Sequence, residues 1–372
     1  MQNPIASEFN FETMRMEMTS FADLVLNPVA QIKFVHSVSA GYVTGAMFIL
    51  AISSYYLLKK RDLDFAKRSF AIASGFGIAA VLSVILLGDE SGYELGDVQK
   101  AKLAAIEAEW ETHPAPASFV AFAIPDQEAK TNHYAIEIPW VMGLIATRSI
   151  DTEVMGIKDI IIENEQRIRN GMVAVEMLEK LRKGDKSPEV KQKFLETKQD
   201  IGYGRMLELH AADVKNPTEA EIKAAAEDTV PQVWPLYFAF RIMVAAGGAL
   251  LLIIGLSLWM TMTNRIGEKR WIHKIALWGL PLPWIACEAG WYIAEYGRQP
   301  WAIADILPTG VAASDLAASE IWFSIFLICG LYSFFLIVEM YLMFKYARLG
   351  PSSLKTGRYH FEQTTATAQS AQ

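Results

Sequence analysis

Four long apolar runs constrain this chain more than any other feature of its sequence. They contain no charged residue, and they cover 37–58, 69–88, 242–263 and 321–338. Each approaches or exceeds the roughly 20 residues that an α-helix needs to cross a bilayer. Hydrophobic residues make up 52% of the 372-residue chain, which is more than a soluble enzyme usually carries. The sequence therefore predicts an all-α polytopic membrane protein.

A fifth membrane helix is expected at about 275–295, although this run is less regular. Pro281, Pro283 and Glu288 interrupt it. Lipid tolerates such breaks only where neighbouring helices satisfy the freed backbone groups and the charge. We therefore expect five membrane helices, with the fifth buried inside a helix bundle.

Basic residues between the apolar runs predict the orientation of the chain. They cluster at 59–68, 265–274 and 345–358, and such clusters favour the cytoplasmic side. The expected order is an extracytoplasmic segment (1–31), two membrane helices (32–88), an extracytoplasmic domain (89–234), three membrane helices (235–347) and a cytoplasmic tail (348–372). The domain 89–234, here called the outward segment, is too long for a passive connection. Its periodicity predicts helices at 98–111 and 163–183.

Charge and motif content exclude several classes of function. The net charge is −7 and no basic stripe with interleaved aromatic residues occurs, which argues against a nucleic-acid partner. The sequence also contains no P-loop, GxGxxG, GxSxG or HExxH motif. The two cysteines, Cys287 and Cys329, form neither a disulfide framework nor a CxxC metal site. We expect them to be small, buried core residues.

Two candidate iron ligands lie at similar depths below the outer surface. His36 and Met243 are about five and eight residues into their helices, which corresponds to roughly 8 and 12 Å. A neutral imidazole and a thioether can together hold a six-coordinate haem iron. Either residue could instead be an ordinary packing residue. Arg241, at a similar depth, requires anions, which haem propionates, Glu295 or another carboxylate would supply.

Two carboxylates, Glu288 and Glu295, lie seven residues apart on one face of the fifth run. Glu295 could bind a high-spin iron weakly through one oxygen, or it could form an ion pair with Arg298 three residues further on. Glu288 lies deeper, and a buried carboxylate in a membrane helix can carry protons.

Five strings spread along the chain resemble one family, subunit I of the cytochrome bd ubiquinol oxidases. The resemblance covers the whole chain, and the GRQPW string is close to diagnostic of the family. The strings are IKFVH at 32–36, GDESGYE at 88–94, FRIM at 240–243, GRQPW at 297–301 and GPSSLKTGRYHFE at 350–362.

The resemblance implies roles for the residues singled out above. His36 and Met243 would be the axial ligands of a low-spin haem b, and Arg241 would stabilise its reduced state. Glu295 would ligate a high-spin haem b. Trp291 resembles the electron-relay tryptophan of the family.

The outward segment would be the quinol-binding loop, with Lys102 and Glu107 matching residues implicated in quinol oxidation. The GRQPW loop, which includes Arg298, would be a structural and quinol-side element. The residues alone predict something different for Lys102 and Glu107. Their spacing of five is not an ion-pair spacing on a helix, so a solvated helix face is the expectation from sequence.

The implied activity is the oxidation of ubiquinol or menaquinol at the outer face and the reduction of dioxygen to water. Protons for water would come from the cytoplasm, so a proton gradient would form without a pump. Glu288 is a candidate for a buried proton-carrying carboxylate. The implied setting is the bacterial inner (cytoplasmic) membrane, with subunit II and a small single-helix subunit as partners.

One departure from the family lies at the start of the chain. Family members usually have nine membrane helices in this subunit, and residue 1 looks like the middle of the family sequence. We therefore expect about four helices to be absent, together with a histidine that ligates haem d, so that the oxygen site is incomplete. The alternatives are an inactive truncated fragment and a membrane transporter that uses Glu288 and Glu295 as ion sites.

Overall fold

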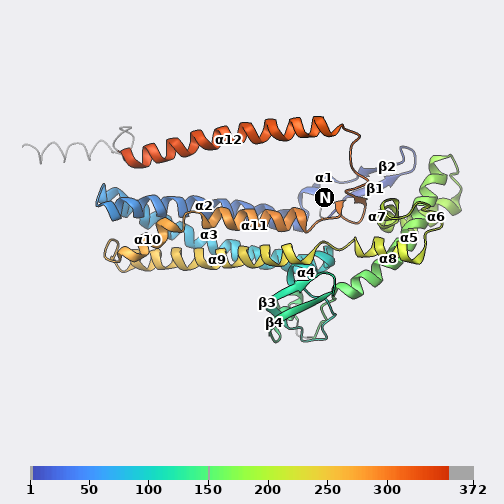
Figure 1. Ribbon diagram of the computed structural model, residues 1–372, viewed down its shortest axis with the longest axis horizontal. Helices are drawn as coiled ribbons and strands as arrows, with labels where there is room; N and C mark the ends of the chain where they lie inside the picture. Colours follow the sequence, from blue (N-terminus) through green and yellow to red (C-terminus); the bar gives the residue numbers. More distant parts are fainter. Residues whose placement is uncertain (1–2, 150, 352–372) are drawn as a thin grey trace, which may run out of the picture. The chain divides into compact units, whose positions relative to one another are not determined.

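The computed structural model describes residues 3–149 and 151–351, and most of them are helical (Figure 1). The long helices are α2 (Pro28–Lys59), α3 (Leu63–Val98), α5 (Ile157–Arg182), α9 (Val233–Met262) and α12 (Ala318–Leu349). The shorter helices are α1 (Phe21–Val25), α4 (Lys100–Glu107), α6 (Pro188–Thr197), α7 (Ile201–Met206), α8 (Glu219–Glu227), α10 (Arg270–Trp278) and α11 (Leu282–Tyr296). A π-helical turn covers Gly143–Thr147, and 3₁₀ turns cover Lys198–Asp200 and Leu207–Leu209. Most of the predicted tail, 352–372, with most of the string at 350–362, lies outside the described residues.

Within residues 3–149 and 151–351, four helices, α2, α3, α9 and α12, are long and apolar enough to cross a membrane. The expected fifth membrane helix is instead two shorter helices, α10 and α11. Helix α10 is capped at its C-terminus by Gly279, and α11 begins directly after Pro281. The break lies here because a proline disfavours the helical conformation of the residue before it, which is Leu280. The 15 residues of α11 rise only about 22 Å, which is less than the roughly 30 Å hydrocarbon core of a bilayer.

The described chain divides into two compact units. The larger unit takes its described residues from Met1–Gly45, Phe76–Leu252 and Pro281–Ala313. Its core combines side chains from α4, β3 (Phe119–Asp126), α5, α7, α8 and α9. Met142, Ile157, Leu207 and Tyr237 are among its fully buried members. The outward segment is therefore an ordered part of this unit, and the predicted helices at 98–111 and 163–183 correspond to α4 and α5.

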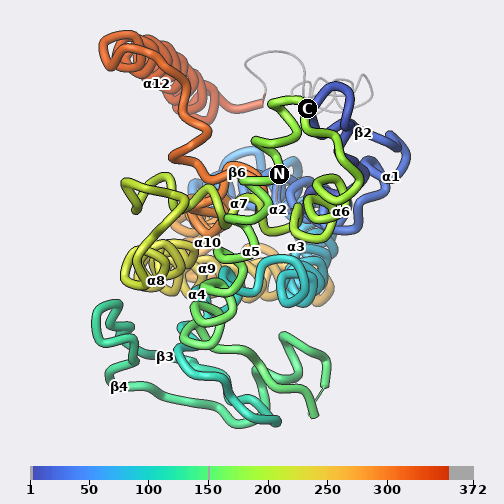
Figure 2. Tube along the Cα trace, turned by 90° about the vertical axis from the view of Figure 1, so that its right-hand side faces the viewer, coloured from blue at the N-terminus to red at the C-terminus, as the bar shows by residue number. Residues whose placement is uncertain are grey.

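Helices α5 and α7 lie side by side (Figure 2). Two glycines, one on each helix, lie at their contact. A Cβ atom on Gly171 would lie 2.2 Å from the carbonyl oxygen of Asp200, and one on Gly204 would lie 2.2 Å from the carbonyl carbon of Gly171. Only glycine permits such an approach of two backbones. This close approach brings Asp200 and Tyr203 against α5.

The described part of the chain also contains three antiparallel strand pairs that an all-α prediction does not include. These are β1 (Ser7–Asn10) with β2 (Arg15–Met18), β3 with β4 (Thr131–Ile138), and β5 (Trp301–Ile303) with β6 (Leu307–Pro308). The pair β3–β4 forms a hairpin of eight-residue strands in the outward segment (Figure 1). Its turn is fixed by Asp126, whose carboxylate accepts hydrogen bonds from the backbone N–H groups of Glu128 and Ala129.

The second unit takes its described residues from Ala46–Gly75, Ile253–Leu280 and 314–351. Its buried polar groups include Ser54, whose hydroxyl lies 3.3 Å from Nδ1 of His273. Helix α12 of this unit has no buried residue at all. Cys329 on α12 and Cys287 on α11 are both exposed, so the expectation that they are buried core residues is wrong. Apolar faces of membrane helices meet lipid or another chain as readily as their own core, and apolar sequence cannot distinguish these.

Candidate functional site

Helix α4 carries two ionisable residues into the interior of the larger unit. All of its residues from Lys102 to Glu107 are buried, and Lys102 and Glu107 are only 4% and 2% exposed. The helix ends at Ala108, which adopts the left-handed conformation (φ 57°). The expectation of a solvated face is wrong, because packing of the outward segment encloses α4 on more than one side. Spacing along α4 gives no signal of this enclosure.

Lys102 reaches from α4 to the end of α11. Its Nζ donates a hydrogen bond to the carbonyl oxygen of Ala294 at 3.4 Å. Its side chain passes so close to Gly297 that a Cβ there would lie 2.9 Å from Cε. A Cβ at position 297 would also lie 2.5 Å from the backbone carbonyl oxygen of Ile293, so the first residue of the GRQPW string has no room for a side chain. Burial lowers the pKa of Lys102 to about 7, helped by the nearby charges of Lys33 and Arg298 and opposed by Glu295.

Glu107, at the other end of α4, pairs with Arg241 on α9. Nη2 of Arg241 lies 2.9 Å from the Glu107 carboxylate, and the guanidinium also donates to the carbonyl oxygens of Ile106 (3.2 Å) and Val120 (2.6 Å). Burial raises the pKa of Glu107 to about 7, although Arg241 opposes this shift. The partner of Arg241 is thus Glu107, and not Glu295 as one alternative held.

Glu295 and Arg298 form the helix-spaced ion pair that the sequence allowed, at 2.8 Å. The structure therefore groups the predicted polar residues into two clusters at the two ends of α4. Lys102 shares its surroundings with Lys33, Glu295 and Arg298, whereas Glu107 pairs with Arg241.

The two candidate iron ligands each pack against a glycine. The ring of His36 on α2 lies beside the backbone of Val84, and a Cβ on Gly88 of α3 would lie 3.4 Å from its Cε1. Nδ1 of His36 is buried and makes no hydrogen bond to a described residue. Sδ of Met243 on α9 would lie 3.2 Å from a Cβ on Gly290 of α11.

These observations bear on whether a haem fits the larger unit. Besides Nδ1 of His36, the buried Nε of Arg241 and Nζ of Lys33 lack hydrogen-bond partners within the ranges 3–149 and 151–351. Buried polar groups are rarely left unpaired unless another molecule completes them. A neutral imidazole, a thioether and unpaired cationic donors suit an iron porphyrin with anionic propionates. The residues present are therefore compatible with haem.

Glu288 and Trp291 lie on the exposed side of α11, and Trp291 is 65% exposed. The expectation that this stretch is buried inside a bundle, with Glu288 as a buried carboxylate, is wrong for this chain. The residues of α11 that are buried are Pro283, Ala289 and Ile293, which follow a single stripe of the helix. The opposite stripe is left for lipid, a cofactor or another chain.

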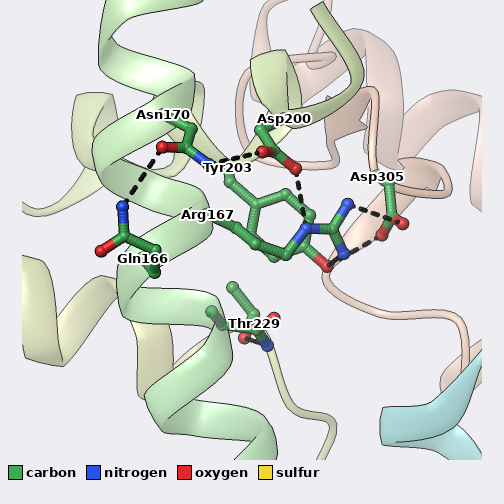
Figure 3. A network of polar contacts seen from close by, with 8 residues as sticks. Gln166, Arg167, Asn170, Asp200, Tyr203, Thr229 and Asp305 are labelled. Carbon is green, nitrogen blue, oxygen red and sulfur yellow. Dashed lines mark hydrogen bonds and ion pairs between the residues drawn. The ribbon is translucent and has the colours of Figure 1, made fainter. Parts of the chain in front are cut away.

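A polar cavity of about 200 Å³ opens beside Lys102. Its wall combines the start of α4, the middle of α5, and the residues from Gly297 to Asp305. The residues that line the cavity include Lys102, Arg167, Tyr203, Arg298, Trp301 and Asp305. The sequence analysis did not single out Arg167, Tyr203 or Asp305, because these residues are 33 to 138 positions from their partners (Figure 3).

Almost the whole described chain matches a known protein family. Residues 1–351 match the family described as cytochrome bd terminal oxidase subunit I. The chain belongs to this family. The resemblance inferred from the five strings is thereby confirmed, and the cytochrome bd subunit I chain can be compared with individual relatives.

The cytochrome bd-II ubiquinol oxidase subunit 1 of Escherichia coli (strain K12) is 49% identical over 96% of this chain and 69% of its own length. The cytochrome bd ubiquinol oxidase subunit 1 of Bacillus subtilis (strain 168) is 28% identical over 87% of this chain and 57% of its own length. The bd oxidase structure from Geobacillus thermodenitrificans matches 94% of this chain and 65% of its own with a TM-score of 0.68 and 22% identity. The fold of this cytochrome bd subunit I chain is thus that of a bd oxidase over about two thirds of that chain.

Proposed function

We propose that this chain is the quinol-oxidising part of a cytochrome bd-type quinol:oxygen oxidoreductase, working within a complex. The relatives from Escherichia coli and Bacillus subtilis are named as ubiquinol oxidases, and a further Bacillus subtilis relative is named as a putative menaquinol oxidase. The observation that carries the proposal is the burial of Lys102 against Gly297 of the GRQPW string, next to a polar cavity.

The cavity beside Lys102 would receive the head group of the quinol. At about 200 Å³ it is smaller than the roughly 300 to 1,000 Å³ of typical small-molecule pockets, so a long tail would remain outside. Lys102 in its neutral form would accept a proton from a quinol hydroxyl at Nζ and then release it to the outer side. Glu107 would hold Arg241 in place from the other end of α4.

Haem would supply one-electron redox chemistry to this chain. His36 and Met243 would hold a low-spin haem b, and the unpaired Nε of Arg241 would face an acceptor on it. Glu295 would exchange its ion pair with Arg298 for a bond to a high-spin haem b. Trp291, on the exposed stripe of the helix that also carries Glu295, would relay electrons between the two haems. We assign no ligand of haem d to this chain.

The position of the quinol site determines how a proton gradient would form. Quinol protons would leave on the outer side, while dioxygen reduction would draw protons from the cytoplasm, so no pump is required. Glu288, on the stripe of α11 that is left for lipid, a cofactor or another chain, would be a proton-carrying or haem-adjacent carboxylate once such a neighbour covers it. The exposed faces of α11 and α12 would meet lipid of the bacterial inner membrane, subunit II or a small single-helix subunit.

Quinol oxidation by the complex of this chain with subunit II tests the proposal. We expect Lys102→Met to lower the rate by about 100-fold, the scale of a lost proton acceptor. Lys180→Met is the matched control, because Lys180 forms an exposed ion pair with Glu176 on α5, away from the cavity. A Lys102→Met complex that oxidises quinol at the wild-type rate would contradict the proposed role.

A further inference from the structure

A cluster of polar side chains joins three segments beside the cavity (Figure 3). Arg167 on α5 donates to the Asp200 carboxylate at 2.7 Å, to the Tyr203 hydroxyl at 2.7 Å and to the Asp305 carboxylate at 3.3 Å. The Tyr203 hydroxyl itself donates to Asp305 at 2.9 Å. Asn170 completes the cluster with a 3.2 Å hydrogen bond to Asp200.

Backbone and ring contacts reinforce the connection. The N–H of Gly202 donates to the carbonyl oxygen of Asp305 at 3.2 Å, and a Cβ on Gly202 would lie 2.4 Å from the same oxygen. The rings of Tyr203 and Trp301 lie 4.9 Å apart at 51°. Trp301 is the last residue of the GRQPW string, so this string is anchored to α7 at the end opposite to Lys102.

The cluster forms part of the cavity wall, because Arg167, Tyr203, Trp301 and Asp305 all line it together with Lys102. Its charges are one guanidinium and two carboxylates, and Asp200 is buried. Loss of Arg167 would leave buried negative charge without a counterion, which is strongly unfavourable. A lysine could not replace it, because one ammonium does not present the planar fork that reaches three acceptors.

We propose that Arg167, Tyr203 and Asp305 are positioning residues for quinol oxidation: they hold the segment 301–306 against α5 and α7, and so fix the cavity wall that faces Lys102. This inference rests on the proposed function. It predicts that the cluster acts on binding of the quinol head group and leaves the groups that accept its electrons and protons unchanged. Loosening the cluster should therefore change KM for quinol much more than kcat.

The test uses the purified complex and the variants Arg167→Met and Tyr203→Phe. Arg169→Met is the matched control, because Arg169 lies on the same helix and pairs with Glu219 of α8 at the surface. We expect both cluster variants to raise KM for a short-chain ubiquinol about tenfold, which corresponds to about 1.4 kcal/mol of weaker head-group binding at a displaced wall, with kcat within twofold of wild type. Hydrogen–deuterium exchange of the peptide that covers 301–308 should become about tenfold faster in Arg167→Met and stay unchanged in Arg169→Met.

Each other outcome overturns the inference in a distinguishable way. Faster exchange with an unchanged KM would mean that the cluster is only structural, and unchanged exchange would mean that it does not hold the segment 301–306. A lower yield of b-type haem with unchanged KM in the remaining complex would also reduce the cluster to a folding role. A wild-type complex that does not oxidise quinol would overturn the proposed function together with this inference.

Discussion

Lys102 and Glu107 show how a single residue can depend on partners that are remote in the sequence. Their types and spacing predict solvation, yet the structure buries both, against Gly297 and Arg241 respectively. The pattern of α4 alone could not reveal this, because the hydrogen-bond partners of the two residues, the carbonyl oxygen of Ala294 and the guanidinium of Arg241, lie 192 and 134 residues further along the chain. Only the resemblance to a known family directed attention to them. By contrast, the ion pair of Glu295 and Arg298 is local and was foreseeable from spacing.

The lowered pKa of Lys102 leads to a prediction about pH. Its neutral amine is populated above about pH 7, so kcat/KM for quinol should rise as pH increases through about 7 and then level off. Lys102→Met should remove this rise. Since the pKa of Glu107 is also about 7, Glu107→Gln is the necessary comparison. A rise that persists in Lys102→Met and disappears in Glu107→Gln would assign the proton acceptor to Glu107 instead.

Gly290 leads to a prediction about the thioether of Met243. A Cβ at position 290 would lie 3.2 Å from Sδ, so Gly290→Ala should displace the sulfur by a few tenths of an ångström. We expect a weakened or shifted low-spin haem b absorbance. The substitution should not unfold α11, because alanine favours the helix over glycine by about 1 kcal/mol. Gly247→Ala on α9 is the control, because its Cβ would meet no atom within 4 Å. Identical spectra of both variants would argue against Met243 as a ligand.

Among the elements, the apolar helices were the most predictable part of the fold. Runs of about 20 uncharged residues have few structural alternatives in a membrane, and α2, α3, α9 and α12 follow them. The division between α10 and α11 was less predictable, because two prolines can either kink a helix or end it. The hairpin β3–β4 escaped prediction because its alternation is irregular, with a register shift on either side of Phe122.

The glycine crossing of α5 and α7 allows a prediction at the same scale. Gly204→Ala would bring a Cβ to 2.2 Å from the backbone of Gly171, so the helices must separate. We expect a loss of at least about 1 to 3 kcal/mol of stability in the outward segment, the usual effect of overpacking. Faster proteolysis of this segment in the native complex would measure it. Gly92→Ala, which meets no atom within 4 Å, should leave the rate of proteolysis unchanged.

At the scale of the whole molecule, the sequence predicted the class of protein and its family, whereas the orientation in the membrane and the haem assignments remain predictions. The larger unit contains every residue assigned above to quinol, to the b haems and to the relay. The second unit supplies the remaining parts of the membrane helices and α12, whose exposed surface is suited to lipid or a partner. In the function proposed above, the larger unit is therefore the one that would oxidise quinol.

The most direct test of this account is a reduced-minus-oxidised absorbance spectrum of membranes that contain this chain and subunit II. We expect a low-spin haem b band that disappears in His36→Ala. The band should persist in His133→Ala, because His133 lies on the exposed strand β4 beside Asp126. A spectrum with no b-type band, or a band that His36→Ala leaves unchanged, would contradict the central claim that this chain holds the haem that receives electrons from quinol.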